Sequence, residues 1–214
     1  MSVGIQGGIV ASTLARYWWV CIAPVLLALY VAAISLLIEI AGNQKPVRPV
    51  NEYYEAVLDF APWHSQAKVD YANYLRNYAL QNEKGEAQSS VLSKGLALVE
   101  SAMHLRPLWP YYHLSALDIE YLLGSPPQVI QSRFDKIVQL APNERGLDRN
   151  FLKLSMFVWN DLRPDQKAWV GNRLLTMSRW TRPDVLETLS ELKGYNPELC
   201  VQLPWALVKS ACRG

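Results

Sequence analysis

The chain has 214 residues, of which 50% are hydrophobic and 19% are charged, and its 21 basic and 19 acidic residues leave a net charge of +2. This near balance does not provide the clustered basic face that nucleic-acid binding requires, so nucleic acid is not expected as a partner. The length is sufficient for a membrane segment and one domain with its own core.

The most distinctive segment is an uncharged apolar run, residues 17–38, that lies between Arg16 and Glu39. A helix of this length can cross a bilayer, which takes about 20 residues. The run is longer than the apolar core of a secretory signal peptide, and no typical cleavage site follows it, which favours an uncleaved anchor. The aromatic residues at positions 17–19 suit the interfacial belt of a membrane protein.

The orientation of this segment depends on the basic residues that flank it, and their numbers on the two sides are nearly equal. Arg16 precedes the run, whereas Lys45 and Arg48 follow it. We expect a short cytoplasmic N-terminus and an exported domain, because the residues before the run are too few to form a domain. The expected organisation is an N-terminal tail at 1–16, a transmembrane helix at 17–41, a polar linker at 42–50 and a soluble helical-repeat domain at 51–214.

Beyond the linker, apolar residues recur at spacings of three and four. Ala67, Tyr71, Tyr74 and Tyr78 make one such stripe, which is typical of an amphipathic helix. No stretch alternates with a period of two, so the predicted fold class is all-α. The expected helices lie near 52–61, 65–81, 87–105, 109–123, 126–141, 146–159, 164–179, 183–193 and 197–210.

Several helix ends are marked by glycine, serine and proline. Gly124 and Gly194 stand where helices should stop. Ser125, followed by two prolines and Gln128, predicts a helix start with Ser125 as the capping residue.

A weak repeat follows from three prolines, Pro62, Pro107 and Pro142, each of which ends an apolar-x-apolar-x-Pro segment after an expected helix. Tetratricopeptide repeats have a period of 34 residues and a proline that closes the second helix. Only one of the two separations, from Pro107 to Pro142, is near this value. We expect a degenerate tetratricopeptide-like array, and an irregular helical bundle is the alternative.

Aromatic residues gather at two of these turns. Trp109, Tyr111 and Tyr112 lie at one turn, and Trp63 lies at the equivalent place one unit earlier. Stacked helices would bring them to one edge, where they could bind sugar rings or a partner protein. The alternative is that tryptophans at repeat joints fill the core between units.

Catalytic and metal-binding patterns are not evident. His64, His104 and His113 lack the spacing of a zinc site, and no phosphate-binding glycine loop or serine-nucleophile motif occurs. Asp118 and Glu120 cannot face one substrate, because residues i and i+2 point apart on a helix. Asp161 and Asp165 bracket a turn. We therefore expect no catalytic, cofactor-binding or metal-binding residue.

Cys200 and Cys212 lie 12 residues apart near the C-terminus. They could form a disulfide in an exported domain, and two free thiols are the alternative. Arg106, Arg163 and Arg182 each precede a proline. The simple interpretation is that they complement the dipole at a helix C-terminus, and a shared basic groove for an acidic glycan is the alternative.

Three segments, 99–112, 134–142 and 159–167, resemble VpsP-like polysaccharide-biosynthesis proteins, and the resemblance covers residues 54–190. It implies one N-terminal membrane segment in the bacterial inner membrane, a tetratricopeptide-like remainder, and an accessory role in making or exporting a surface glycan. We expect a non-enzymatic scaffold without cofactors that binds protein partners of this machinery. A glycan-binding module that uses the aromatic residues is the alternative.

Overall fold

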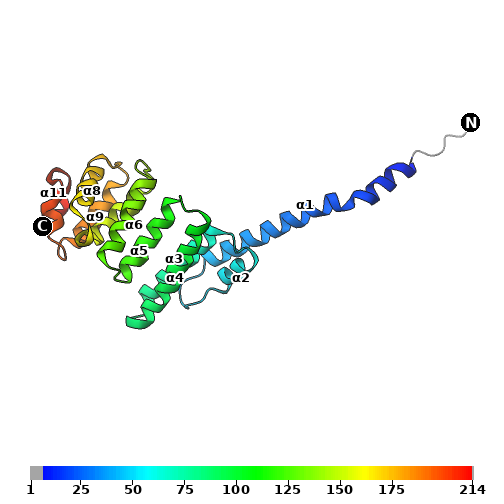
Figure 1. Cartoon of the computed structure of the whole chain (residues 1–214), viewed down its shortest axis with the longest axis horizontal. Helices are drawn as coiled ribbons and strands as arrows, with labels where there is room; N and C mark the ends of the chain where they lie inside the picture. The colour runs from blue at the N-terminus through cyan, green and yellow to red at the C-terminus, as the bar shows by residue number, and fades with distance from the viewer. Residues whose placement is uncertain (1–6, 214) are drawn as a thin grey trace, which may run out of the picture. The chain divides into compact units, whose positions relative to one another are not determined.

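The computed structural model describes the backbone of residues 7–213 and the side chains of residue 20 and residues 22–213. Over this range the chain is all-α and contains no strand, as predicted. It divides into two compact units, made of residues 1–45 with 50–63 and of residues 46–49 with 64–214. Figure 1 shows the long helix α1 in the first unit and the packed helices in the second.

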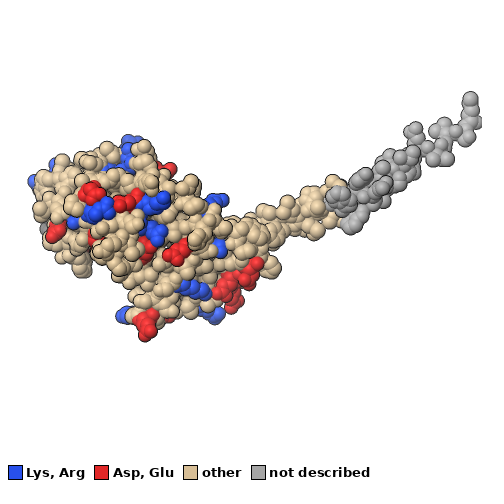
Figure 2. Space-filling view, viewed as in Figure 1, with Lys and Arg blue, Asp and Glu red and all other residues tan. Residues whose placement is uncertain are grey.

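The first unit consists of α1, Gly7–Gly42, and the short helix α2, Glu52–Phe60. Residues Ile22–Gly42 have a mean hydropathy of 2.3, and α1 is long and apolar enough to span a membrane. Figure 2 shows the described part of this rod without charged side chains on the visible face. The predicted tail at 1–16 lies partly outside the described residues, and the predicted aromatic belt at 17–19 lies outside the described side chains.

Helix α2 packs against the last turns of α1. Asn51 caps α2, because its side-chain oxygen accepts hydrogen bonds from the amides of Tyr53 and Tyr54 at 3.2 and 3.3 Å. Tyr54 and Val57 on α2 are buried, as is Ile34 on α1. α2 thus lies in the same compact unit as α1, although its residues fall within the predicted range of the soluble domain, 51–214, which stays a prediction.

The second unit begins with helices that follow each other in space as in sequence. α3 packs on α4, α4 on α5 and α5 on α6, and Figure 1 shows them side by side. The remaining short helices close the C-terminal end. The bounds are α3 Ser65–Asn82, α4 Gly85–Leu105, α5 Pro110–Leu122, α6 Pro127–Leu140, α7 Asp148–Phe157, η1 Trp159–Asp161, α8 Pro164–Thr176, α9 Arg182–Leu192, α10 Glu198–Gln202 and α11 Trp205–Cys212.

The predicted helices agree with these bounds except at the C-terminus. The single helix expected at 197–210 is two helices, α10 and α11, separated at Leu203 and Pro204. Proline disfavours the α conformation in the residue before it and lacks the amide that would continue the ladder. Leu203 is accordingly extended, with φ −83° and ψ 154°.

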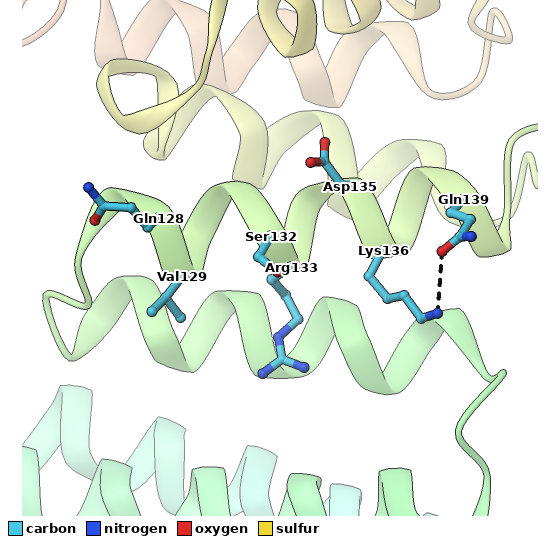
Figure 3. A pocket seen from close by; sticks show the side chains of 7 residues that line it. All are labelled: Gln128, Val129, Ser132, Arg133, Asp135, Lys136 and Gln139. Atoms are coloured by element: carbon cyan, nitrogen blue, oxygen red, sulfur yellow. Dashed lines mark hydrogen bonds between the residues drawn. The ribbon is translucent and has the colours of Figure 1, made fainter.

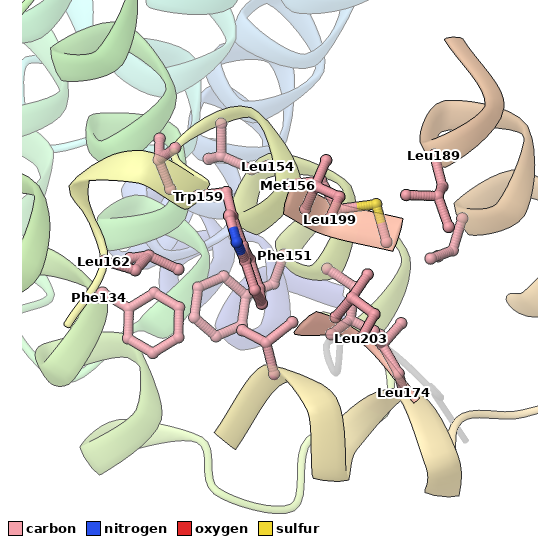
Figure 4. Close-up of a cluster of buried hydrophobic side chains, with 14 of the residues drawn as sticks. Phe134, Phe151, Leu154, Met156, Trp159, Leu162, Leu174, Leu189, Leu199 and Leu203 are labelled. Atoms are coloured by element: carbon pink, nitrogen blue, oxygen red, sulfur yellow. The ribbon is translucent and has the colours of Figure 1, made fainter. Parts of the chain in front are cut away.

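Two apolar cores hold the second unit together. One lies among α3, α4 and α5 around Leu92, Val99 and Ile119. The larger core joins α5 and α6 to all later helices, and Trp159 and Phe134 are among its largest members (Figure 4). Phe134 packs on Phe151 with ring centroids 4.8 Å apart. The C-terminal helices therefore belong to the same hydrophobic body as α5 and α6.

A buried ion pair fixes the connection between α6 and α7. The Arg173 guanidinium donates to Asp148 Oδ1 at 2.6 Å and to the carbonyls of Pro142 and Glu144 at 2.9 and 3.1 Å. A buried charge is tolerated when its partner and hydrogen bonds are complete, as they are here.

The same backbone conformation ends three helices. The C-cap residues Ala61, Arg106 and Ala141 have φ/ψ values of −134°/64°, −138°/72° and −139°/55°. In each case the cap amide donates to the carbonyl four residues earlier, and the next residue is proline. The recurring Pro signal in the sequence thus corresponds to a recurring turn, and the tetratricopeptide assignment itself stays a prediction.

Gly124 ends α5, as its position predicts. It has φ +68°, its amide bonds to the Tyr121 carbonyl, and the Ser125 amide bonds to the Glu120 carbonyl. These two bonds form a Schellman motif, which favours glycine at the left-handed position. Ser125 therefore completes the end of α5 and does not cap α6, contrary to the expectation. Its successor Pro126 is the N-cap residue of α6.

Replacing Gly124 with alanine should reduce the free energy of unfolding by about 1 kcal/mol, because a Cβ is disfavoured in the left-handed conformation. Gly194→Ala is the control, since Gly194 lacks a positive φ and no atom lies within 4 Å of a Cβ placed there. Thermal unfolding of the full-length chain in detergent, followed by circular dichroism, measures both. Equal midpoints for the two variants would contradict this assignment of the turn.

Candidate functional site: a groove on alternate helices

A groove of about 500 Å³ runs across four alternate helices of the second unit, α3, α5, α7 and α9. Each helix contributes residues at the three- and four-residue spacings that place side chains on one helical face. The lining residues are Asn73, Arg76, Asn77, Leu114, Ser115, Asp118, Asn150, Lys153, Leu154, Phe157, Thr188 and Glu191.

An ion pair joins two of these helices inside the groove. Arg76 on α3 contacts Asp118 on α5, with 2.5 Å from Nε to Oδ2 and 3.1 Å from Nη2 to Oδ1. The same guanidinium donates to Asn77 Oδ1 at 3.1 Å. Both charged side chains are less than one-third exposed, and one hydrogen bond from Nη2 together with the ionic contact of Nε joins α3 to α5. The pair therefore places one positive and one negative charge at a defined position in the groove.

Other polar side chains in the groove are available to a ligand. Among the described residues, Asn73, Asn150, Lys153 and Glu191 form no side-chain hydrogen bond or ion pair with the rest of the chain. Asn73, Asn150 and Glu191 are exposed, and Lys153 is half-buried. Amide side chains both donate and accept, so they match the backbone of an extended polypeptide, and Lys153 matches a carboxylate.

Apolar contact is also available. Phe157 at the end of α7 is exposed, and its ring centroid lies 6.2 Å from that of Tyr121. Leu114 and Leu154, which also line the groove, are buried. One aromatic anchor among convergent polar groups is a common composition for a binding surface. The lining contains no His or Cys, and of its two acids Asp118 is held by Arg76 whereas Glu191 is exposed.

The predicted aromatic surface is only partly present. Trp109 and Tyr111 are exposed, with ring centroids 5.5 Å apart at 34°. Partial burial, with a smaller effect of the Glu144 charge, raises the pKa of the Tyr111 hydroxyl. Tyr112 is 1% exposed, and its hydroxyl donates to Ser65 Oγ at 3.0 Å in the α3–α5 contact. Including Tyr112 in this surface was therefore wrong, because the residue faces the core.

Trp63 also differs from its expected place. Helices α3 and α5 both begin at the third residue after the repeated proline, so His64 corresponds to Trp109 and Trp63 to Leu108. Trp63 is exposed and belongs to the first unit. An edge shared by Trp63 and Trp109 stays a prediction.

The three histidines have different environments. His64 Nδ1 accepts the Ala67 amide at 3.1 Å and thereby caps α3. His104 is exposed, whereas His113 is buried and contacts the Pro107 carbonyl through Nε2 at 3.0 Å. A carbonyl only accepts, so Nε2 carries the proton and Nδ1 is the unprotonated nitrogen. No cluster of metal-binding side chains occurs among the described residues.

Burial lowers the pKa of His113, and the nearby Arg133 cation acts in the same direction. Arg133 in turn forms the main buried contact of Glu120, with Nη2 and Oε1 2.5 Å apart. Glu120 thus faces α6 whereas Asp118 faces α3, so these two carboxylates point apart, as the helical spacing predicts.

Neither the Asp161 and Asp165 pair nor the three arginines that precede prolines form a site. Asp165 bonds to the Arg163 side chain, which lowers the pKa of Asp165. Arg163 is the N-cap of α8, and Arg182 is the first residue of α9. The proposed C-terminal role therefore fits only Arg106, the C-cap of α4, because in the other two cases the following proline opens a helix.

A second hollow of about 660 Å³ lies along α6 alone. Figure 3 shows its lining side chains along this one helix, with Lys136 bonded to Gln139. Arg133 in this set is already bound to Glu120, and Asp135 is bound to Arg163 and Gln166. This hollow is a shallow surface with occupied charges, unlike the groove, which four helices line.

The sequence does not predict the groove. In the sequence, the residues that line the groove show only polar positions at helical spacing, such as Asn73, Arg76 and Asn77. That pattern is the same for any solvated helix face, so only the packing of α3, α5, α7 and α9 reveals it.

Comparison with protein-family models, curated proteins and solved structures finds no match to this chain.

The low pKa of His113 predicts a pH effect on stability. Above its unfolded pKa of about 6.5 the residue is neutral in both states, and below it the unfolded chain binds a proton more readily, so stability falls as the pH falls. Between pH 7.5 and 5.5, His113→Gln should lose stability less steeply than the unmodified chain. The exposed His104→Gln is the control and should keep the original slope. Identical slopes for both variants in urea unfolding would contradict this environment for His113.

Proposed function

We propose that the chain is a non-enzymatic, single-pass membrane scaffold whose helical unit binds a segment of a partner protein in the groove. The observation that carries the proposal is the groove itself, where the paired Arg76 and Asp118 stand among unpaired polar groups and an exposed Phe157. Arrays of stacked helices commonly bind extended peptides on such surfaces.

Helix α1 supports the membrane attachment. It exposes leucine and valine side chains along the described part of the rod, including Leu26, Leu29 and Val31, and these are the side chains that insertion into lipid favours. The proposed location is the bacterial inner membrane.

The proposed orientation places the second unit in the periplasm. Cys200 and Cys212 form a disulfide in the structure, between α10 and the end of α11. Disulfides persist in oxidising compartments such as the periplasm and are rare in the cytosol. This bond supports an exported unit, whereas the flanking basic residues do not decide the orientation.

The glycan setting of the proposal rests on the resemblance of segments 99–112, 134–142 and 159–167 to VpsP-like polysaccharide-biosynthesis proteins. On this basis the partners are protein components of a machine that makes or exports a surface glycan. The chain itself would hold them at the membrane and need no cofactor.

Charge reversal and loss of the ring in the groove test the scaffold role. Lys153→Glu and Phe157→Ser should each lower recovery of the partner protein about tenfold, which corresponds to about 1.4 kcal/mol of binding. Lys136→Glu on α6, outside the groove, is the control. Quantitative mass spectrometry after gentle membrane extraction from the native cell measures recovery.

Thermal midpoints of these variants should stay near that of the unmodified chain, because Phe157 is exposed and Lys153 has no ionic partner in the described chain. Equal recovery of the same partners by all variants would contradict binding in the groove.

The second candidate function is a glycan-binding module, and the exposed Trp109–Tyr111 pair favours it, because sugar rings pack on exposed aromatic faces. Trp109→Ala should then weaken retention of the cell's own polysaccharide while the thermal midpoint changes little. Trp180→Ala, at another exposed tryptophan, is the control. Unchanged retention would exclude this function, and a collapse of stability would show that Trp109 fills the core.

A further inference from the structure

We propose that the C-terminal tip of α2, with Phe60 and Trp63, inserts into the interface of the membrane that α1 spans, as a second lipid contact. This inference rests on the membrane anchoring in the proposed function. Its occupant is the lipid bilayer, and it reassigns Trp63 from partner binding to lipid binding.

Two hydrogen bonds define the direction of α2 along α1. At its start, the Asn51 side chain donates to the Ala41 carbonyl at 3.2 Å. At its end, the Tyr30 hydroxyl donates to the Phe60 carbonyl at 2.8 Å. α2 therefore runs antiparallel to α1, from the level of Ala41 back to the level of Tyr30. Eleven residues separate these levels, which is about 16 Å along a helix.

The uncharged run of α1 indicates where along the helix the hydrocarbon core of the membrane ends. The uncharged run ends at Ile38, and its length of about 33 Å matches a hydrocarbon core of about 30 Å. If the boundary lay at Tyr30 instead, a span of about 20 residues would begin near position 11 and would enclose the charged Arg16, which insertion into lipid disfavours. The boundary near Ile38 is therefore favoured.

With that boundary, Tyr30 lies about 12 Å inside the end of the run. The tip of α2 lies beside Tyr30, so it reaches about the same depth, slightly deeper than the roughly 5–10 Å at which interfacial helices bury their apolar faces. Phe60 and Trp63 are 64% and 63% exposed. Phe60 is joined to α1 through its carbonyl, and both side chains lie in the same compact unit as the exposed apolar residues of α1, so they can extend its lipid-facing surface.

The acidic residues of α2 limit how deep its tip can lie. Glu52 lies in the first turn, at the Ala41 level and outside the proposed boundary. Asp59 is exposed one residue before Phe60, so insertion of the tip requires local thinning of the bilayer or water around this carboxylate. This requirement limits the tip to the interface and keeps it out of the hydrocarbon centre. Tryptophan and tyrosine are enriched in this layer.

Site-directed spin labelling in vesicles of phosphatidylethanolamine and phosphatidylglycerol tests the inference on the full chain. Single cysteines are introduced as Phe60→Cys and Trp63→Cys in a Cys21→Ser background, in which Cys200 and Cys212 are protected by their disulfide. Glu52→Cys, at the other end of α2, is the matched control. Leu27→Cys, on the exposed face of α1, reports on the anchor itself.

Collision rates with oxygen, which concentrates in lipid, and with a water-soluble nickel chelate give the depth of each label. The ratio of oxygen to nickel collisions should be several-fold higher at 60 and 63 than at 52, and highest at 27. Water exposure at 60 and 63 with lipid exposure at 27 would overturn this inference alone. Water exposure at 27 as well would overturn the membrane anchoring, and lipid exposure at 52 would contradict the proposed boundary.

Discussion

The transfer of the α1 surface from water to lipid is the interaction on which the proposed function depends. Leu26, Leu29, Val31 and Leu36 are all exposed, and α2 covers only the last turns of the helix. Each such side chain favours insertion by about 0.3–0.6 kcal/mol at the centre of a bilayer. A helix with this surface in water would aggregate, so the environment of α1 determines where the second unit works.

The second unit depends on a different constraint, the repeated turn at Arg106 and Ala141, which also occurs at Ala61 in the first unit. Each turn ends a helix with the same backbone conformation and is followed by proline. Within this unit the turns and the Gly124 motif keep α3 to α6 in sequential contact, which places α3, α5 and later α7 and α9 so that their polar faces meet in the groove. The groove is thus a consequence of helix order, and its residues lie far apart in sequence.

Features set by local sequence can be predicted, whereas features set by contacts between distant residues cannot. Helix positions follow from local patterns, such as the apolar stripe of Tyr71, Tyr74 and Tyr78, and most bounds agree within a few residues. The break at Pro204 was missed, although it is also local. The burial of Tyr112 depends on contact with Ser65, 47 residues away, and the pairing of Arg76 with Asp118 spans 42 residues. Such contacts leave no periodic signal, so the aromatic surface was wrong in part and the groove was not foreseen.

The central claim is that an intact α1 anchors the chain in a membrane. Extraction of native membranes with alkaline carbonate tests it most directly, with mass spectrometry of the N-terminus of the retained protein. The account predicts that the protein stays with the membrane pellet and that its sequence still includes residues 17–38. Release into the carbonate supernatant, or a mature N-terminus beyond residue 38, would contradict it.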